Sequence, residues 1–390
     1  MNLRIFIALL DGLGMGELPD AAEYGDEGSH TLANLSRKVG GLSCPTLERL
    51  GLGKIEPILG IVAVNKAEGW YGKMIEKSVG KDTTTGHWEM MGVITERPFP
   101  VYPHGFPKEI INEIERVTGF QVLGNKPASG TTIIEEYGAE HIRTGFPILY
   151  TSADSVLQIA AHEEIISIKD LYRLCEMVRG IMKGDHAVAR IIARPFVGQP
   201  GNFQRTSRRK DFSLSPPYPT VLDVLLEKGI QVAGVGKIGD VFTGRGISEN
   251  FKTTSNSDTF RVFFELLDDE RFGLIWANFN DFDTLYGHRN DTIGFQKALE
   301  SWDAQLKEFL PRLRFNDLLI ITSDHGCDPT TPSTDHSREH ALLICASPQL
   351  LMGDSLGIRN SFADIGATVA QLFGIPWSGP GTSFSFIIGD

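Results

Sequence analysis

Cysteine is scarce in this chain of 390 residues, which contains four, at positions 44, 175, 327 and 345. They are widely separated and form no Cys-x-x-Cys pair, so the sequence indicates neither a disulfide framework nor a zinc–thiolate site. Long apolar runs are also absent: no stretch approaches the roughly 18 apolar residues of a membrane-spanning helix. We therefore predict a cytoplasmic protein with reduced thiols and no membrane partner.

Basic residues are too few to dominate the surface. The chain has 37 Lys and Arg against 49 Asp and Glu, a net charge of -12. This balance excludes nucleic acid as the main partner, because phosphate backbones require clustered basic side chains. An anionic substrate would need a local positive site, either a metal ion or a few Lys and Arg. The composition, 41% hydrophobic and 22% charged, is otherwise that of a globular protein.

Strand and helix patterns alternate through the first and last parts of the chain. The opening segment MNLRIFIALL is apolar, but Asp11 and Gly12 follow without a small-residue cleavage site, which favours a buried strand over a signal peptide. Further strand patterns occupy residues 230–235, 273–279, 318–322 and 340–346, and helical patterns occupy 30–39, 220–228, 292–313 and 364–373. This alternation predicts an α/β fold with a mainly parallel sheet sandwiched by helices.

The middle third has a different organisation. Helical patterns at 108–118 and 169–182 alternate with short strand patterns at 121–123, 148–150 and 187–193, as in a compact α+β block. Prolines cluster at both borders, at 98–103 and at 216–219. We predict that residues 98–216 form a smaller domain inserted into a catalytic core made of residues 1–97 and 217–390.

Carboxylates and imidazoles occur at spacings that suit metal ions. Three predicted strands are each followed by an aspartate, and the carboxyl ends of parallel strands meet at one edge of a sheet. An Asp taken alone is more simply explained as a turn former, and a His taken alone as an ordinary surface or core residue. Together they are enough for two divalent ions, and they suit Mn²⁺ or Mg²⁺ better than Ca²⁺ or a thiolate-bound metal. The candidate ligands are Asp11, Asp283, His288, Asp324, His325 and His336.

A hydroxyl-rich segment, DTTTGH at residues 82–87, supplies a candidate nucleophile. A threonine hydroxyl becomes a useful nucleophile when a metal ion or base lowers its pKa, and two ions with such a hydroxyl predict phosphoryl transfer. Residue type does not distinguish Thr83, Thr84 and Thr85. The structural alternative is a threonine-rich turn ending at Gly86.

Eight segments together resemble the alkaline phosphatase superfamily and, within it, the phosphopentomutase family. They are LLDGLGMGELPDA (9–21), GKDTTTGHWEMMG (80–92), GNKPASGT (124–131), TSADSVLQIAAHEE (151–164), ARPFVGQPGNF (193–203), GKIGD (236–240), DFDTLYGHRND (281–291) and DHGCDPTTPSTDHSREH (324–340). The metal-ligand segments are shared across the superfamily, whereas those at 80–92, 124–131 and 151–164 narrow the resemblance to the mutases.

The resemblance implies a role for each matching residue. Asp11, Asp324 and His325 would hold one Mn²⁺, and Asp283, His288 and His336 the other, with Mg²⁺ or another divalent ion as alternatives. Thr83 would carry the phosphoryl group. Ser152, Asp154 and Val156 would line the sugar phosphate site, and Arg190, Arg194 and Lys237 would bind the distal phosphate.

The activity implied is the interconversion of (deoxy)ribose 1-phosphate and (deoxy)ribose 5-phosphate, as in nucleoside catabolism. Phosphothreonine would donate its phosphoryl group, a pentose 1,5-bisphosphate would form, and glucose 1,6-bisphosphate or a similar sugar bisphosphate would be the activator. The inserted domain would act as a cap that closes and excludes water.

Three other activities are alternatives. A cofactor-independent phosphoglycerate-mutase-like enzyme would use a serine nucleophile, and a metal-dependent phosphohydrolase would release phosphate steadily. A sugar-phosphate-binding protein would need no complete metal-ligand set, so the six ligands argue against it. The expected partners are small-molecule pentose phosphates, and the sequence leaves the oligomeric state open.

Overall fold

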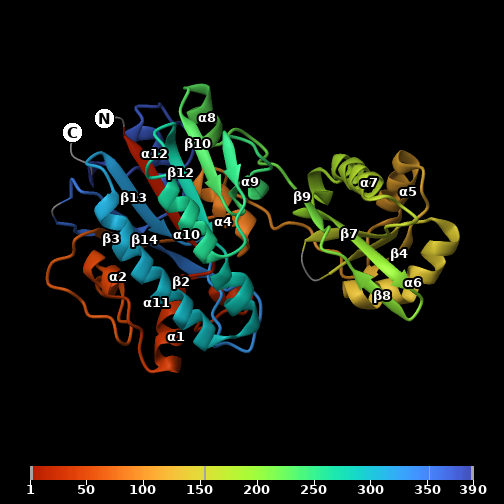
Figure 1. Ribbon diagram of the computed structural model, residues 1–390, viewed down its shortest axis with the longest axis horizontal. Helices are drawn as coiled ribbons and strands as arrows, with labels where there is room; N and C mark the ends of the chain where they lie inside the picture. Colours follow the sequence, from red (N-terminus) through yellow and green to blue (C-terminus); the bar gives the residue numbers. More distant parts are fainter. Residues whose placement is uncertain (1–2, 153–154, 351, 388–390) are drawn as a thin grey trace. The chain divides into compact units, whose positions relative to one another are not determined.

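The computed structural model describes residues 3–152, 155–350 and 352–387, and the chain forms two compact units (Figure 1). The core unit comprises Met1–Arg97 and Pro216–Asp390, and the inserted unit comprises Pro98–Ser215. This division differs by one residue from the insertion at 98–216 that the proline-rich borders suggest.

The core unit is built on one large sheet. In the described residues its strand order is β11-β10-β12-β1-β13-β14-β3-β15, with β2 paired to β14. Neighbours from β11 to β13 are parallel, whereas β14 runs antiparallel to β13 and β3. The strands are β1 Arg4–Leu10, β2 Gly14–Glu17, β3 Trp70–Met74, β10 Gln231–Val235, β11 Glu249–Phe251, β12 Phe272–Phe279, β13 Asp317–Thr322, β14 Glu339–Ala346 and β15 Ser355–Arg359.

Helices cover both faces of this sheet, as the alternating pattern predicts. On one face α10 packs on β12 and α11 packs on α1 and α2, and on the other α12 packs on α4 and α8 (Figure 1). Every residue of β1, β13 and β14 is buried, which explains the apolar runs that make up most of their sequences. The helices are α1 Thr31–Val39, α2 Pro45–Leu50, α3 Leu52–Ile55, α4 Thr83–Met90, α8 Val221–Glu227, α9 Ile238–Val241, α10 Asn256–Glu265, α11 Thr292–Phe309 and α12 Ala363–Leu372.

The inserted unit has its own sheet and its own apolar clusters. The strand order among described residues is β4-β5-β6-β7-β8, with β9 paired to β7. Helices α5 and α7 pack on one face and α6 on the other. The strands are β4 Leu123–Pro127, β5 Ile148–Thr151, β6 Val156–His162, β7 Arg190–Gln199, β8 Asn202–Arg205 and β9 Lys210–Ser213; the helices are α5 Lys108–Thr118, α6 Gly130–Thr144 and α7 Ile168–Ile181.

Some local expectations differ from the structure. The threonine-rich segment is not a turn ending at Gly86, because Gly86 lies inside α4, a helix capped by the Asp82 side chain. The strand pattern at 121–123 gives way to β4 at Leu123–Pro127. No helix among the described residues has both the length and the apolar character needed to cross a bilayer.

Candidate active site

Three neighbouring parallel strands, β12, β1 and β13, bring the predicted carboxylates to one edge of the core sheet. Asp11 directly follows β1, and its backbone N–H donates to the carbonyl of Phe279 at the end of β12. Asp324 lies just beyond β13, and its Oδ1 accepts from the backbone N–H of Gly12 at 3.2 Å. Asp283 lies in a short π-helical turn, Phe282–Tyr286, after β12. The three side chains are buried.

Asp11, Asp324 and His325 form one compact group of potential metal ligands. Nε2 of His325 lies 3.4 Å from Oδ1 of Asp11 and 3.3 Å from Oδ2 of Asp324. The three donor atoms therefore face a common point. This group has the same members as the first ligand set that the resemblance implies.

The second implied set is distributed over two overlapping groups that share Asp283. One joins Asp283 to His325 and His336, and the other joins it to His288 and Cys327. Oδ1 of Asp283 lies 3.3 Å from Nε2 of His336 and 3.4 Å from Nε2 of His288. Nδ1–H of His288 donates to the carbonyl of Thr334 at 2.7 Å, which turns Nε2 toward the carboxylate.

The charges of the cluster are mutually dependent. Burial alone would raise the pKa of Asp324, but the neighbouring imidazoles of His325 and His87 outweigh it and hold the pKa well below the usual range. Burial would lower the pKa of His325, and Asp324, Asp283 and Asp11 together raise it instead to about 10. Burial and then Asp324 raise the pKa of Asp11. Within the cluster, the buried carboxylate of Asp324 and the neighbouring imidazole of His325 thus stabilise each other's charged form.

Divalent ions fit these residues. Oδ1 of Asp11, Oδ1 of Asp283 and Oδ2 of Asp324 are buried and lack a hydrogen-bond partner among the described residues. An unsatisfied buried carboxylate oxygen is costly, and a metal ion would satisfy it. Carboxylate oxygens combined with imidazole nitrogens suit Mn²⁺, Fe²⁺ or Zn²⁺.

Thr83 is the first residue of α4, and its hydroxyl lies at this cluster. Oγ1 of Thr83 is 3.4 Å from Nε2 of His325. The hydroxyl of Thr85 instead donates to the carbonyl of Asp82 at 2.9 Å. The tertiary structure therefore separates threonines that residue type alone leaves equivalent.

Lys237 reaches the same hydroxyl from the turn after β10. Its Nζ donates to Oγ1 of Thr83 at 2.8 Å and forms an ion pair with Asp11. Burial opposes the charge on this ammonium, but Asp11, Asp324 and Asp283 together raise its pKa. Lys237 thus lies beside the candidate nucleophile, and the distal-phosphate role that the resemblance implies for it stays a prediction.

The other predicted substrate residues belong to the inserted unit. Val156 begins β6 and Arg190 begins β7, and the two are paired in register. Arg190 lies 3.7 Å from Asp211, and Nε of Arg194 donates to Oε1 of Gln158 at 2.9 Å. Ser152 is half-buried just after β5. Asp154 lies outside the described residues.

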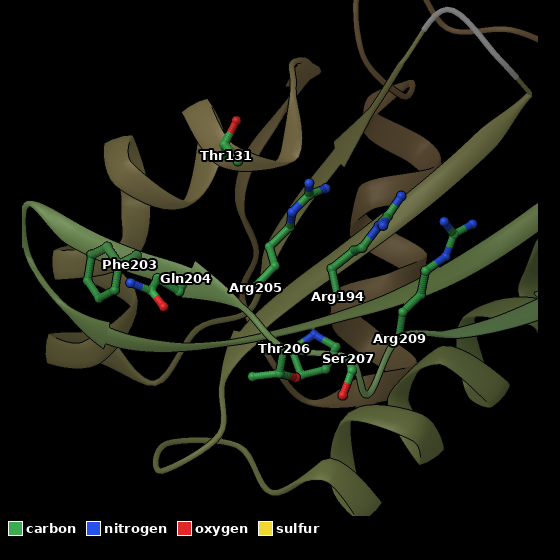
Figure 2. Close-up of a pocket in the computed structure, with 9 residues that line it drawn as sticks. Thr131, Arg194, Phe203, Gln204, Arg205, Thr206, Ser207 and Arg209 are labelled. Atoms are coloured by element: carbon green, nitrogen blue, oxygen red, sulfur yellow. The ribbon is translucent and has the colours of Figure 1, made fainter. Parts of the chain in front are cut away.

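A cavity of about 570 Å³ in the inserted unit is lined by Arg194, Arg205 and Arg209. Arg205 and Arg209 were not among the predicted substrate residues. Figure 2 shows Arg205, Arg194 and Arg209 side by side in the cavity, with their guanidinium groups on the same side. Arg209 pairs with Asp211 at 2.6 Å, whereas among the described residues Arg194 and Arg205 form no ion pair. The basic run RTSRRK at 205–210, unusual in an acidic chain, was the available signal.

The hydroxyl of Tyr150 also faces this region. It is buried without a hydrogen-bond partner among the described residues, and a Cβ on Gly130 would lie 2.9 Å from it and 3.2 Å from Nη1 of Arg205. Gly130 is the first residue of α6, so the arginines and the hydroxyl lie near a helix N-terminus, which attracts anions. The cavity is suited to a phosphate group.

Comparison with known proteins finds a matching family model, similar proteins and a solved structure with a similar fold. Residues 3–377 match the family model of the metalloenzyme superfamily. The phosphopentomutase of Caldanaerobacter subterraneus subsp. tengcongensis is 56% identical over 384 residues, 98% of each chain. That of Thermotoga maritima is 53% identical over 388 residues, 99% of this chain and all of its own. A solved structure from Pyrococcus horikoshii, 14% identical, has a TM-score of 0.51 over 98% of this chain and 99% of its own, which shows a shared fold.

Proposed function

This chain belongs to the phosphopentomutase family within the metalloenzyme superfamily, a family of isomerases, and on that premise we propose that it interconverts ribose 1-phosphate and ribose 5-phosphate. The proposal includes the 2-deoxyribose equivalents. The observation that carries it is the position of the Thr83 hydroxyl, between the ammonium of Lys237 and the imidazole of His325. A phosphoryl group on that oxygen would have a cation on one side and metal-ligating groups on the other.

We assign the metal ligands as the resemblance implies. Asp11, Asp324 and His325 would hold one Mn²⁺, and Asp283, His288 and His336 would hold the second, with Mg²⁺ or another divalent ion as alternatives. When bound, the two ions would stabilise the charge on the transferring group and lower the pKa of the attacking hydroxyl. The proposal is supported by the three buried carboxylate oxygens that lack a partner among the described residues.

The transfer itself runs through Thr83. The bond between phosphorus and Oγ1 of phospho-Thr83 breaks, a bond to the free hydroxyl oxygen of the pentose phosphate forms, and the proton of that hydroxyl passes to the departing Oγ1. The product is a pentose 1,5-bisphosphate, and Oγ1 then takes the opposite phosphoryl group. Lys237 stays beside Oγ1 and balances the negative charge of the phosphothreonine. Because each cycle begins with phosphothreonine, glucose 1,6-bisphosphate or a similar bisphosphate is the expected activator.

We assign recognition of the phosphate that is not being transferred to the inserted unit. Arg190 and Arg194 come from the resemblance, and Arg205 is added because its guanidinium faces the same cavity as Arg194 without an ion pair among the described residues. Ser152, Asp154 and Val156 would contact the sugar. We further propose that the enzyme works in the cytoplasm on pentose phosphates from nucleoside catabolism, consistent with its four buried free cysteines.

The decisive assay follows ribose 1-phosphate and free phosphate after the protein is mixed with Mn²⁺, a trace of glucose 1,6-bisphosphate and ribose 5-phosphate. We expect isomer formation without phosphate release. Thr83→Ala should abolish it, because the phosphoryl group has no carrier. Thr84→Ala is the matched control: it removes a neighbouring hydroxyl that makes no contact with the cluster within the described part of the chain, and it should retain activity.

Each other outcome identifies an alternative. Steady phosphate release without isomer exchange would make the protein a phosphohydrolase. Turnover of phosphoglycerate but not of ribose 5-phosphate would identify a phosphoglycerate-mutase-like enzyme. Saturable binding of ribose 5-phosphate without any turnover would leave a sugar-phosphate-binding protein.

A further inference from the structure

One buried histidine beneath the nucleophile has no part in the transfer described above. His87 lies one helical turn after Thr83 in α4, on the same face of the helix, and its side chain is 0% exposed. Nδ1–H of His87 donates to the backbone carbonyl of Thr83 at 2.9 Å. The ring therefore contacts the nucleophilic residue through its backbone and not through its hydroxyl.

The same ring is linked to both carboxylates of the first ligand group, directly to Asp324 and through Asn278 to Asp11. Nδ1 of His87 lies 3.1 Å from Oδ2 of Asp324. Nε2 lies 3.2 Å from Oδ1 of Asn278, and Nδ2 of Asn278 donates to Oδ2 of Asp11 at 2.9 Å. One side chain thus joins the start of α4 to Asp324 directly and to Asp11 through a single amide.

The surroundings allow this arrangement little freedom. The imidazole stacks on the indole of Trp276, with ring centroids 5.5 Å apart and planes 19° apart. The preceding residue, Gly86, approaches Asp324 so closely that a Cβ there would lie 2.2 Å from the Asp324 carbonyl oxygen. Helix α4 is therefore packed directly against the strand end that carries Asp324.

We propose that His87 is a positioning residue, which with Asn278 fixes the nucleophile helix to the carboxylates of the first metal site. Metal binding at that site and the orientation of Thr83 are thereby coupled. Groups that orient metal ligands contribute to metal affinity, and their loss typically lowers it about 10–100-fold. The inference deepens the proposed function and rests on it for the presence of metal.

Two substitutions at this position distinguish the contacts of Nδ1 from those of Nε2. The amide nitrogen of asparagine occupies roughly the place of Nδ1, and that of glutamine roughly the place of Nε2. His87→Gln should lose the contacts with Asp324 and Thr83, and His87→Asn should lose the contact with Asn278. Asn278→Ala removes the link to Asp11 without touching α4.

The test is Mn²⁺ binding to the full chain, measured by calorimetry without sugar phosphate, together with steady-state kinetics. We expect His87→Gln to weaken one of two Mn²⁺ sites about 10–100-fold and to leave the other unchanged. His87→Asn should weaken it less. In kinetics kcat should fall, while KM for ribose 5-phosphate stays constant. The control is His141→Gln, another fully buried histidine that lies in the inserted unit and should change neither site.

Folded His87→Gln with both Mn²⁺ affinities intact would overturn the inference. If that variant does not fold, Asn278→Ala decides, and unchanged affinity at both of its sites would be equally negative. A wild-type protein that binds no divalent ion would instead refute the two-metal function on which the inference rests. The two failures are therefore distinguishable in one titration series.

Discussion

The ammonium nitrogen of Lys237 lies 2.8 Å from the hydroxyl oxygen of Thr83, although 154 positions separate the two residues in the sequence. The same ammonium pairs with Asp11, a proposed metal ligand. A cation at this point would neutralise a phosphoryl group on Thr83, and it would also repel a metal ion bound by Asp11. These two effects act in opposite directions and can be measured separately.

Lys237→Met should therefore slow turnover without weakening metal binding. Removal of one preorganised charge-stabilising donor costs about 100-fold or more in kcat. The Mn²⁺ affinity of the first site should stay equal or increase, because a neighbouring positive charge has been removed. Calorimetry with Mn²⁺ and the mutase assay check the two halves, and a parallel loss of both affinity and kcat would contradict this role for Lys237.

Gly86→Ala should disturb the packing of α4 against the segment that carries Asp324. The added Cβ would meet the Asp324 carbonyl oxygen at 2.2 Å, so the helix or the strand end must shift. We expect a loss of about 1–3 kcal/mol in the free energy of unfolding, measured with urea, and weaker Mn²⁺ binding. Gly180→Ala in α7 is the control: a Cβ there meets nothing within 4 Å, and it should be neutral or stabilise by about 0.5–1 kcal/mol.

Arg205→Gln should raise KM for ribose 5-phosphate with little change in kcat. The guanidinium faces a cavity suited to phosphate, and a hydrogen bond to a charged group contributes about 1.5–3 kcal/mol, which corresponds to about 10–100-fold in affinity. Arg143→Gln, a change at a highly exposed side chain on α6, is the control and should leave KM unaltered. An unchanged KM in Arg205→Gln would remove this residue from the substrate site.

The stability of the core unit should depend on Glu56 in acid. Burial would raise the pKa of this carboxyl, but hydrogen bonds from His30 and Lys73 outweigh it and lower the pKa from 4.5 to about 2. Because the folded pKa is depressed, its contribution is complete above about 4.5 and is lost as the pH falls toward about 2. Glu56→Gln should cost about 1 kcal/mol at neutral pH, allowing for its partial exposure, and should flatten the stability profile in that window.

Urea unfolding across the acid range measures this effect. Glu68→Gln is a matched control, because Glu68 belongs to an exposed ion pair with Arg49 at 3.5 Å. An unchanged profile for Glu56→Gln would show that the carboxyl is not held ionised by its two partners.

Elements buried on both faces or strongly amphipathic could be predicted from local sequence. The buried strand predicted in the opening segment is confirmed at Arg4–Leu10, and the helix predicted from Thr292 begins there, although it ends as an α-helix at Phe309 and continues as a short 3-10 turn. In such segments the hydrophobic period is itself the cause of the structure. In these segments the local hydrophobic pattern and the tertiary environment favour the same structure, so the pattern alone predicts it.

Helix α6 shows why other elements could not be predicted. Its first turns contain Thr131, Thr132, Ile133 and Ile134, which are β-branched and weak helix formers, and Gly138 interrupts its middle. The helix forms because Ile133 and Ile134 are buried against the inserted sheet. Gly138 leaves room for the ring of Phe203, because a Cβ at this position would lie 2.3 Å from that ring. Tertiary packing outweighed local propensity.

The chemical groups of this protein, its carboxylates, imidazoles and threonines, and their places after apolar strands can be read from the chain alone. Which of these groups meet depends on the folded arrangement. It brought the Thr83 hydroxyl to His325 and Lys237, His87 to Asp324, and Arg205 to Arg194. Local sequence specifies strands and helices through short-range periodicity, whereas contacts between distant side chains depend on strand order and on the close packing of helices against the sheet.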